Sequence, residues 1–303
     1  MCCLFGLLDA RQQYSGAKKS RMLHALATAA EVRGTDAAGY AYNGSDGLVV
    51  RKSPVPGHKL RFSLSDDTVT VMGHTRMTTQ GDARKNRNNH PFPGRAGGKP
   101  FAFAHNGIIQ NDGELRERFK LPHTKIETDS YVAVQLLETQ ETLDFDSLRF
   151  AAEQLEGSFT FTVLDGQDGL YIVKGDNPLS LIRFPKTGLF LYASTREILE
   201  EAMKSCSQSA NNGVWEQVES GEMLKIDRAG VVTRSRFDDS KLLGWHTPYP
   251  YACVPHPCYQ SDGSYIGELK SVAYAFGYTP GVIDRLLARG FQPEEIEAML
   301  YET

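Results

Sequence analysis

The sequence predicts an α+β fold built from paired antiparallel strands. Short apolar segments come in pairs separated by turn residues: residues 38–42 and 48–52 flank a stretch rich in Asn and Gly, which is typical of a hairpin. Helical segments lie between groups of strands rather than after every strand, which argues against a parallel sheet. The sequence contains no internal repeat and no low-complexity segment.

Local patterns place the elements in order. Residues 3–8 are an apolar run suited to a buried strand. Residues 18–32 predict a helix, because their apolar residues share one face and Gly34 follows as a stop signal. The loop after residue 81 is polar, and its stretch from Gly94 to Gly98 is expected to be flexible. Further strands are expected at 69–72, 101–104, 159–163, 170–173, 189–193, 222–226 and 231–232. Further helices are expected at 112–119, from a cap at 127–130 to residue 137, at 147–155 and at 195–204.

Composition excludes several classes of function. A net charge of −4 over 303 residues leaves no basic footprint for nucleic acid. No apolar stretch approaches the roughly 20 residues that span a membrane, and the N-terminus lacks the pattern of a signal peptide. Five cysteines in a chain of this size do not resemble a disulfide framework. We therefore expect a reduced, cytoplasmic protein with no nucleic-acid or membrane partner.

The second residue is a candidate nucleophile. The chain opens Met1-Cys2-Cys3, and removal of Met1 would leave Cys2 with both a thiol and a free α-amine. An α-amine titrates near pH 7.7–8.0, which suits a general base, and a thiol is intrinsically very nucleophilic. The alternative is an ordinary start followed by a buried strand.

Three further sites carry residue types that could complete a centre in which a thiolate attacks a carbonyl. Asn106-Gly107 offers a side-chain amide and an open backbone N–H for an oxyanion, although Asn-Gly is also a common turn. Arg76 can bind a carboxylate through two parallel bonds, and Asp129 can accept from an α-ammonium. An Arg after a strand and an Asp at a helix N-cap are equally common as structural residues.

Seven ordered motifs together resemble the class II glutamine amidotransferase domain, an N-terminal-nucleophile (Ntn) hydrolase family. They are Met1-Cys2, RGTDAAG from residue 33, GHTR from 73, NNHPF from 88, HNGII from 105, ETDS from 127 and GSF from 157. The resemblance covers residues 2–237 and implies an αββα four-layer sandwich of two mostly antiparallel sheets. Residues 238–303 are then an extended segment followed by a small helical C-terminal extension.

The resemblance also implies roles for individual residues. Cys2 corresponds to the nucleophile and Asn106 with Gly107 to the oxyanion hole, while Arg76 and Asp129 correspond to the residues that hold the α-carboxylate and α-amine of glutamine. Pocket-shaping positions are matched by Arg33, Thr79 and His90. The implied reaction forms a γ-glutamyl thioester on Cys2, releases ammonia and needs no metal or organic cofactor.

Two positions depart from the family pattern. The sugar-amidotransferase form reads HTRWATHG where this chain has HTRMTTQG, so Met77 replaces an aromatic residue and Gln80 replaces a histidine. Both lie in a loop that closes over glutamine in relatives. We expect the two changes to affect the affinity for glutamine and the coupling of hydrolysis to ammonia transfer, but not the hydrolysis itself.

About 66 residues follow residue 237, too few for a synthase domain that would use the ammonia. The resemblance therefore implies a stand-alone glutaminase-type domain that delivers ammonia to a separate synthase. The alternatives are a hydrolase of γ-glutamyl amides or peptides, and a non-catalytic binding protein on the same fold. Cys253, His256 and Cys258 are too few for a convincing zinc site, and two short helices at 282–288 and 293–301 resemble small ubiquitin-associated modules or a packed cap.

Overall fold

The computed structural model describes residues 2–242, 266, 269–270, 281–293 and 295–296. The chain divides into two compact units, Met1–Thr247 and Pro248–Thr303, and each is considered by itself. The boundary expected after residue 237 falls inside the first unit, near its end.

A seven-stranded antiparallel sheet has β1 near its centre. Its strand order is β11–β9–β10–β1–β4–β2–β3. β1 pairs with β4 on one edge, with Cys3 opposite Thr75, and with β10 on the other, with Phe5 opposite Ala193. The strands are β1 (Cys3–Asp9), β2 (Ala37–Gly44), β3 (Gly47–Ser53), β4 (Thr70–Arg76), β9 (Ser180–Phe184), β10 (Leu189–Ala193) and β11 (Val214–Glu216).

A second antiparallel sheet has six strands in the order β13–β12–β8–β7–β6–β5. β6 is its longest strand and pairs with β7 along its length, so that Asn106 lies opposite Thr160. The strands are β5 (Phe92–Ala96), β6 (Lys99–Ile109), β7 (Gly157–Asp165), β8 (Leu170–Lys174), β12 (Glu222–Ile226) and β13 (Val232–Arg236).

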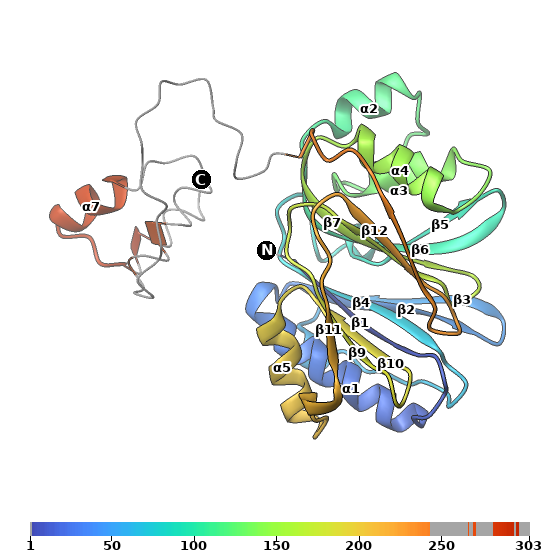
Figure 1. The fold of residues 1–303 in the computed structure, drawn as a ribbon. Helices are drawn as coiled ribbons and strands as arrows, with labels where there is room; N and C mark the ends of the chain where they lie inside the picture. Colours follow the sequence, from blue (N-terminus) through green and yellow to red (C-terminus); the bar gives the residue numbers. More distant parts are fainter. Residues whose placement is uncertain (1, 243–265, 267–268, 271–280, 294, 297–303) are drawn as a thin grey trace. The chain divides into compact units, whose positions relative to one another are not determined.

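Helices cover the outer face of each sheet. Figure 1 shows α1 and α5 outside the first sheet and α2, α3 and α4 outside the second, so the first unit has four layers. The α-helices of this unit are α1 (Gly16–Ala29), α2 (Asp112–Arg118), α3 (Tyr131–Glu138), α4 (Phe145–Gln154) and α5 (Arg196–Ser205). Short 3₁₀ turns are η1 (Ala30–Arg33), η2 (Gly57–Lys59), η3 (Asn86–Asn88) and η4 (Ala210–Asn212).

Strand alternation divides the apolar residues among three core layers. In β1, Phe5 and Leu7 face α1 and α5, whereas Leu4 and Leu8 belong to the cluster between the two sheets. Both faces of this strand are buried, which explains its continuous apolar sequence. The αββα sandwich of two antiparallel sheets that the sequence predicts is therefore confirmed.

Several element predictions need correction. β6 does not end at residue 104 but continues to Ile109, because its pairing with β7 extends from Phe101 to Ile109. The glycine-containing stretch expected to be flexible lies largely in β5, which pairs with β6. β9 and β11 were not expected, and the helix predicted to reach residue 32 ends at Ala29 and continues as η1.

The second unit is described only in part. It contains α7 (Gly281–Ala288), close to the helix expected at 282–288, and a small cluster of Leu269, Ile283 and Ile296. The helix expected at 293–301 falls only partly within the described residues. Trp245 to Tyr259, with Cys253, His256 and Cys258, lies outside them, so the zinc alternative is not addressed.

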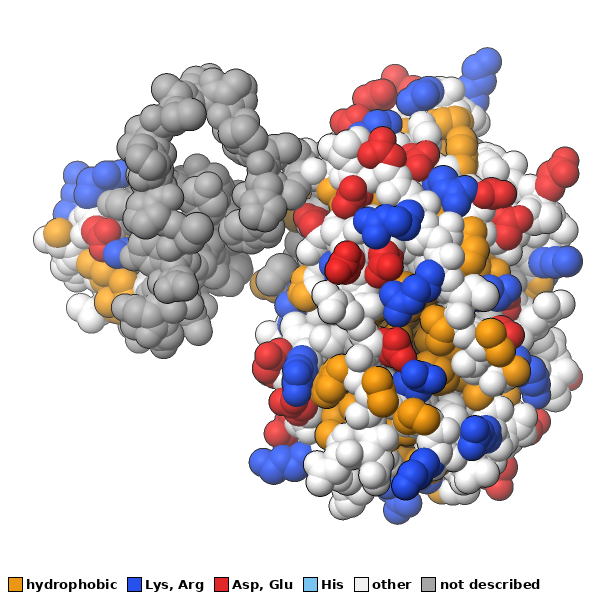
Figure 2. Space-filling model, in the orientation of Figure 1, with side chains coloured by type: hydrophobic (Ala, Val, Ile, Leu, Met, Phe, Trp, Pro, Cys, Tyr) orange, Lys and Arg blue, Asp and Glu red, His pale blue; other side chains and the backbone are white. Residues whose placement is uncertain are grey.

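Acidic and basic side chains are interspersed on the visible face of the first unit (Figure 2). This agrees with the small net charge of the sequence. Within the described ranges, no helix has the length and apolarity to cross a membrane, and no three His, Cys, Asp or Glu residues group as metal ligands.

Three histidines lie buried in the first unit. His74 of β4 and His105 of β6 are fully buried, and His90 lies with its ring centroid 4.2 Å from that of His74. Burial lowers the pKa of His74 to about 3 and also lowers the pKa of His90 and of His105. All three are therefore neutral in the folded protein near pH 7.

These histidines make the fold sensitive to acid. A histidine in the unfolded chain takes up a proton below about pH 6.5, whereas the buried ring stays neutral down to its lower folded pKa. The stability contributed by the neutral ring is therefore fully present above about pH 6.5 and decreases as the pH falls toward the folded pKa. For His74 the loss reaches about 2 kcal/mol at about pH 5. Urea unfolding between pH 7 and pH 5 measures this loss in the free energy of unfolding. We expect His74→Asn to reduce the dependence of that free energy on pH by up to about 1.4 kcal/mol per pH unit. The exposed His24→Asn is the control, and an unchanged slope in His74→Asn would contradict the assignment.

Candidate active site

Cys2 immediately precedes β1, the middle strand of the seven-stranded sheet, and the pairing of that strand fixes the backbone beside Cys2. Its neighbour Cys3 pairs with Thr75 of β4, and Arg33 Nε donates a 2.9 Å hydrogen bond to the Cys2 carbonyl. Cys2 as a whole is half-buried, and its thiol, directed inward, donates to the Met77 carbonyl at 3.4 Å. The candidate nucleophile is therefore held from three segments of the chain.

Alternation directs the key side chains into the space between the sheets. Leu4 belongs to the layer between the sheets, so Cys2, two residues earlier, lies on the same face. On the opposite sheet Ala104 belongs to this layer, and Asn106 follows it by two residues. Because β1 contacts β6, the strand faces that carry Cys2 and Asn106 both border the space between the sheets.

Burial keeps the Cys2 thiol protonated. Desolvation raises its pKa above the usual value, while the Met77 hydrogen bond and the charge of Arg76 act in the opposite direction and Asp129 adds to the rise. A thiol in this state needs a nearby base before it can attack. The same interactions show that Cys2, Arg76 and Asp129 share one electrostatic environment.

Asn106 and Gly107 have the features of an oxyanion hole. The Asn106 side chain is 1% exposed, and both its amide nitrogen and its oxygen lack partners among the described residues. An unpartnered buried amide is costly, so its nitrogen is available to a bound group. Gly107 has φ +143°, and a Cβ there would lie 1.9 Å from the Ser158 carbonyl. Only glycine fits this part of β6.

Arg76 ends β4 with its guanidinium buried among neutral acceptors. It donates to Asn89 Oδ1 at 2.7 Å and to the carbonyls of Gln80 and Gly81. No carboxylate among the described residues makes an ion pair with Arg76. Its positive charge therefore remains available to an anionic ligand.

Asp129 lies beside the end of β6. Its Oδ2 accepts from the Ile109 N–H at 2.7 Å, and its own N–H donates to Gln80 Oε1 at 3.0 Å. Ser130, the next residue, is 2.8 Å from His105 Nδ1. Asp129 is thus positioned by β6, and the loop that contacts Arg76 also contacts Asp129.

The remaining candidate residues differ in placement. Arg33 lies against the Cys2 backbone, and His90 is buried between His74 and Phe92. Thr79 is exposed, and its side chain makes no hydrogen bond within the described part of the chain. Arg33 therefore contacts the candidate nucleophile directly, whereas the role expected for His90 and Thr79 stays a prediction.

Sequence reasoning assigned no role to Asn89, Gln80 or Glu127, although all lie beside the site. Asn89 and Glu127 belong to the motifs NNHPF and ETDS, and Gln80 was noted only as a departure. Membership of these motifs was the feature of the sequence that could have marked Asn89 and Glu127 as part of the site. The Met77 carbonyl is a backbone group and leaves no signal in a sequence.

Comparisons with known proteins identify related domains. Residues 74–201 match a family model described as a glutamine amidotransferase domain. Glutamine–fructose-6-phosphate aminotransferase (isomerizing) of Halobacterium salinarum is 32% identical over 186 residues, which are 59% of this chain and 30% of that enzyme. The enzyme of the same name from Sulfurisphaera tokodaii is 33% identical over 188 residues, 59% of this chain and 31% of that enzyme. The chain thus spans about a third of these relatives.

Solved structures show the same fold. Glutamine phosphoribosylpyrophosphate amidotransferase of B. subtilis superposes with a TM-score of 0.59 at 19% identity, over 78% of this chain and 49% of that chain. A structure described as the allosteric regulatory enzyme of purine biosynthesis gives a TM-score of 0.60 at 20% identity, with the same coverage. Residues 74–201 therefore match a glutamine amidotransferase domain, and the chain shares the fold of these two solved structures.

Proposed function

We propose that this protein hydrolyses the γ-amide of glutamine through Cys2 and releases ammonia for an acceptor on a separate partner. The proposal is supported by the shared electrostatic environment of Cys2, Arg76 and Asp129, together with the unpartnered buried amide of Asn106 on the facing sheet. Arg76 would bind the α-carboxylate and Asp129 the α-ammonium. Two opposite charges at fixed positions select an α-amino acid.

The proposed reaction starts from Cys2 after removal of Met1. The free α-amine takes the thiol proton, and the thiolate attacks the γ-carbonyl carbon to give a tetrahedral oxyanion. The Asn106 side chain and the Gly107 N–H stabilise that charge. Return of the proton to the nitrogen breaks the C–N bond, releases ammonia and leaves a thioester. Water then adds to the thioester, which yields glutamate and restores the thiol.

The acceptor lies outside the matched region. The chain spans 30% and 31% of the two aminotransferases named above, so their sugar substrate is not transferred to this protein. We propose a separate synthase partner because the match covers the glutamine-hydrolysing domain type. A cytoplasmic location stays a prediction from the sequence.

The first experiment measures ammonia and glutamate release from purified protein whose intact mass shows loss of Met1. Glutamine and several γ-glutamyl peptides are compared, with Cys2→Ala as the inactive variant and Cys206→Ala as the matched cysteine control. We expect turnover of glutamine that is abolished in Cys2→Ala and retained in Cys206→Ala.

Other outcomes would redirect the proposal. Turnover confined to γ-glutamyl peptides would replace glutamine hydrolysis with γ-glutamyl hydrolysis. Absence of turnover together with absence of Cys2 labelling by a glutamine-analogue electrophile would favour the binding-protein alternative. Labelling without turnover would indicate an enzyme that requires its partner.

Asn106→Ala tests the oxyanion role separately. Loss of one oxyanion donor should lower kcat by about 10²–10³-fold with little change in KM, because the interaction forms only in the transition state. Since the Asn106 amide has no partner in the described structure, the substitution should not lower the unfolding midpoint. The exposed Asn211→Ala is the control. A rise in KM at unchanged kcat would argue against this role.

A further inference from the structure

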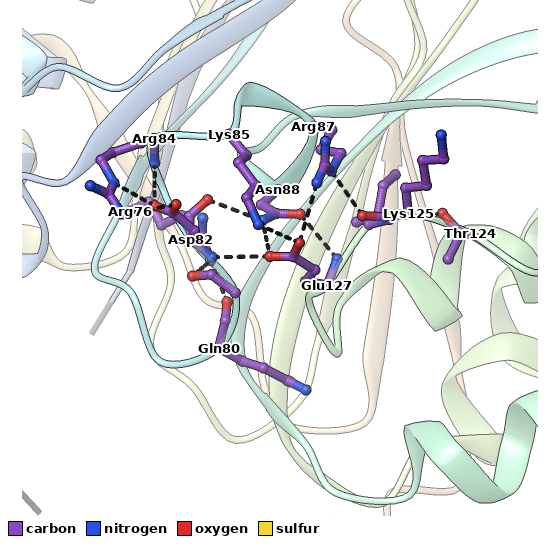
Figure 3. Close-up of polar contacts among 12 residues, drawn as sticks. Arg76, Gln80, Asp82, Arg84, Lys85, Arg87, Asn88, Thr124, Lys125 and Glu127 are labelled. Atoms are coloured by element: carbon purple, nitrogen blue, oxygen red, sulfur yellow. Dashed lines mark hydrogen bonds and ion pairs between the residues drawn. The ribbon is translucent and has the colours of Figure 1, made fainter.

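Two segments beside the candidate site are joined through one carboxylate, that of Glu127 (Figure 3). Its Oε1 accepts from Lys85 Nζ at 2.7 Å and from Arg87 Nη2 at 3.3 Å. Its Oε2 accepts from Asn88 Nδ2 at 2.9 Å and from the Asp82 N–H at 3.4 Å. We call Glu127 and these four partners the Glu127 cluster.

The contacts between the two segments are reciprocal. The Glu127 N–H donates to Asn88 Oδ1 at 3.0 Å, and Arg87 Nε donates to the Lys125 carbonyl at 2.9 Å. Asn88 Nδ2 also donates to the Asp82 carbonyl at 3.0 Å. Lys85 and Arg87 precede Glu127 by about 40 residues, so the cluster fixes tertiary structure rather than a local turn.

Each joined segment contacts one of the residues expected to hold glutamine. On one side, the carbonyls of Gln80 and Gly81 accept from Arg76 Nη2. On the other, Asp129 lies two residues after Glu127 and donates its N–H to Gln80 Oε1. A continuous path therefore runs from Arg76 through Gln80 and Asp82 to Glu127 and Asp129.

We infer that Glu127 is a positioning residue that fixes the separation of Arg76 and Asp129, and through it the affinity for an α-amino acid. The inference rests on the proposed function and deepens it. Glu127 itself contacts neither Cys2 nor Asn106 in the described structure, so it acts through the 80–89 segment. Its expected effect is on substrate binding rather than on the chemical step.

Salt, rather than pH, should modulate this arrangement. Hydrogen bonds from Lys85 and then Asn88 lower the pKa of Glu127 to about 2, so the carboxylate stays ionised at working pH. The side chains of Lys85, Arg87 and Glu127 are 43%, 45% and 37% exposed, which leaves their ion pairs open to screening. Dissolved salt can therefore weaken the cluster.

The test compares Glu127→Gln with Glu200→Gln in the full chain. Glu200 pairs with Arg196 on α5 and is also half-exposed, so this control removes the same charge and a similar ion pair away from the site. We expect Glu127→Gln to raise KM for glutamine about fivefold, with kcat changed less than about twofold, and Glu200→Gln to change neither. KM rises at unchanged kcat when the lost interaction stabilises the bound substrate and the transition state equally.

Two further measurements show that the effect passes through the cluster. The ratio of the Glu127→Gln KM to the wild-type KM should fall as salt rises from about 0.01 M to about 1 M, where the Debye length shortens from about 30 Å to about 3 Å. Lys85→Met should raise KM in the wild-type background but add little to Glu127→Gln, because its partner charge is already absent.

A separate binding measurement distinguishes failure of this inference from failure of the proposed function. Calorimetric titration of glutamine into Cys2→Ser needs no turnover, and Glu127→Gln should weaken that binding about fivefold. Equal KM and equal affinity in Glu127→Gln and Glu200→Gln would overturn the inference while leaving the hydrolase intact. A fall in kcat without a rise in KM would also overturn it. Absence of glutamine binding to Cys2→Ser would overturn both proposals.

Discussion

The pairing of β1 on both of its edges is the constraint on which the rest of the site depends. A strand hydrogen-bonded to β4 and to β10 has a fixed register, so the residue before Cys3 has a fixed position beside the end of β4. A shift of one residue would turn every side chain of β1 to the other face. Cys2 would then point toward α1 and α5, and Leu4 would leave the layer between the sheets.

The second sheet completes the site because its inner face meets that strand. Asn106 and Gly107 are presented by the continuous β6–β7 pairing, and Asp129 is bound to the Ile109 N–H at the end of the same strand. The site is therefore built on paired strands, and in the described part of the chain the segment from Met77 to Asn89 forms an irregular wall beside it. The Glu127 cluster gives that wall a fixed position, which is how a polar, partly exposed segment can take part in precise recognition.

Much of this arrangement could be predicted from the sequence, and the exceptions have physical causes. Apolar alternation and turn residues located most strands, and motif resemblance located Cys2, Arg76, Asn106 and Asp129. The length of β6 was underestimated because His105, Asn106 and Gly107 are not typical strand residues; only tertiary pairing with β7 keeps them extended. β5 was not predicted for the same reason, because its glycine is not a typical strand residue and the strand is maintained by its pairing with β6. Asn89 and Glu127 act through contacts distant in sequence, and the Met77 carbonyl belongs to the backbone, so single-sequence patterns could not assign them.

The connectivity of β1 also sets an order of events during synthesis. Its partners are residues 70–76 and 189–193, so this strand gains its second neighbour only after residues 189–193 have been synthesised. Once β4 and β10 have paired with it, Cys2 is half-buried and tied to Arg33 and Met77. Under the proposed chemistry, the position of the nucleophile is therefore settled only when residues 70–76 and 189–193 have both joined the sheet.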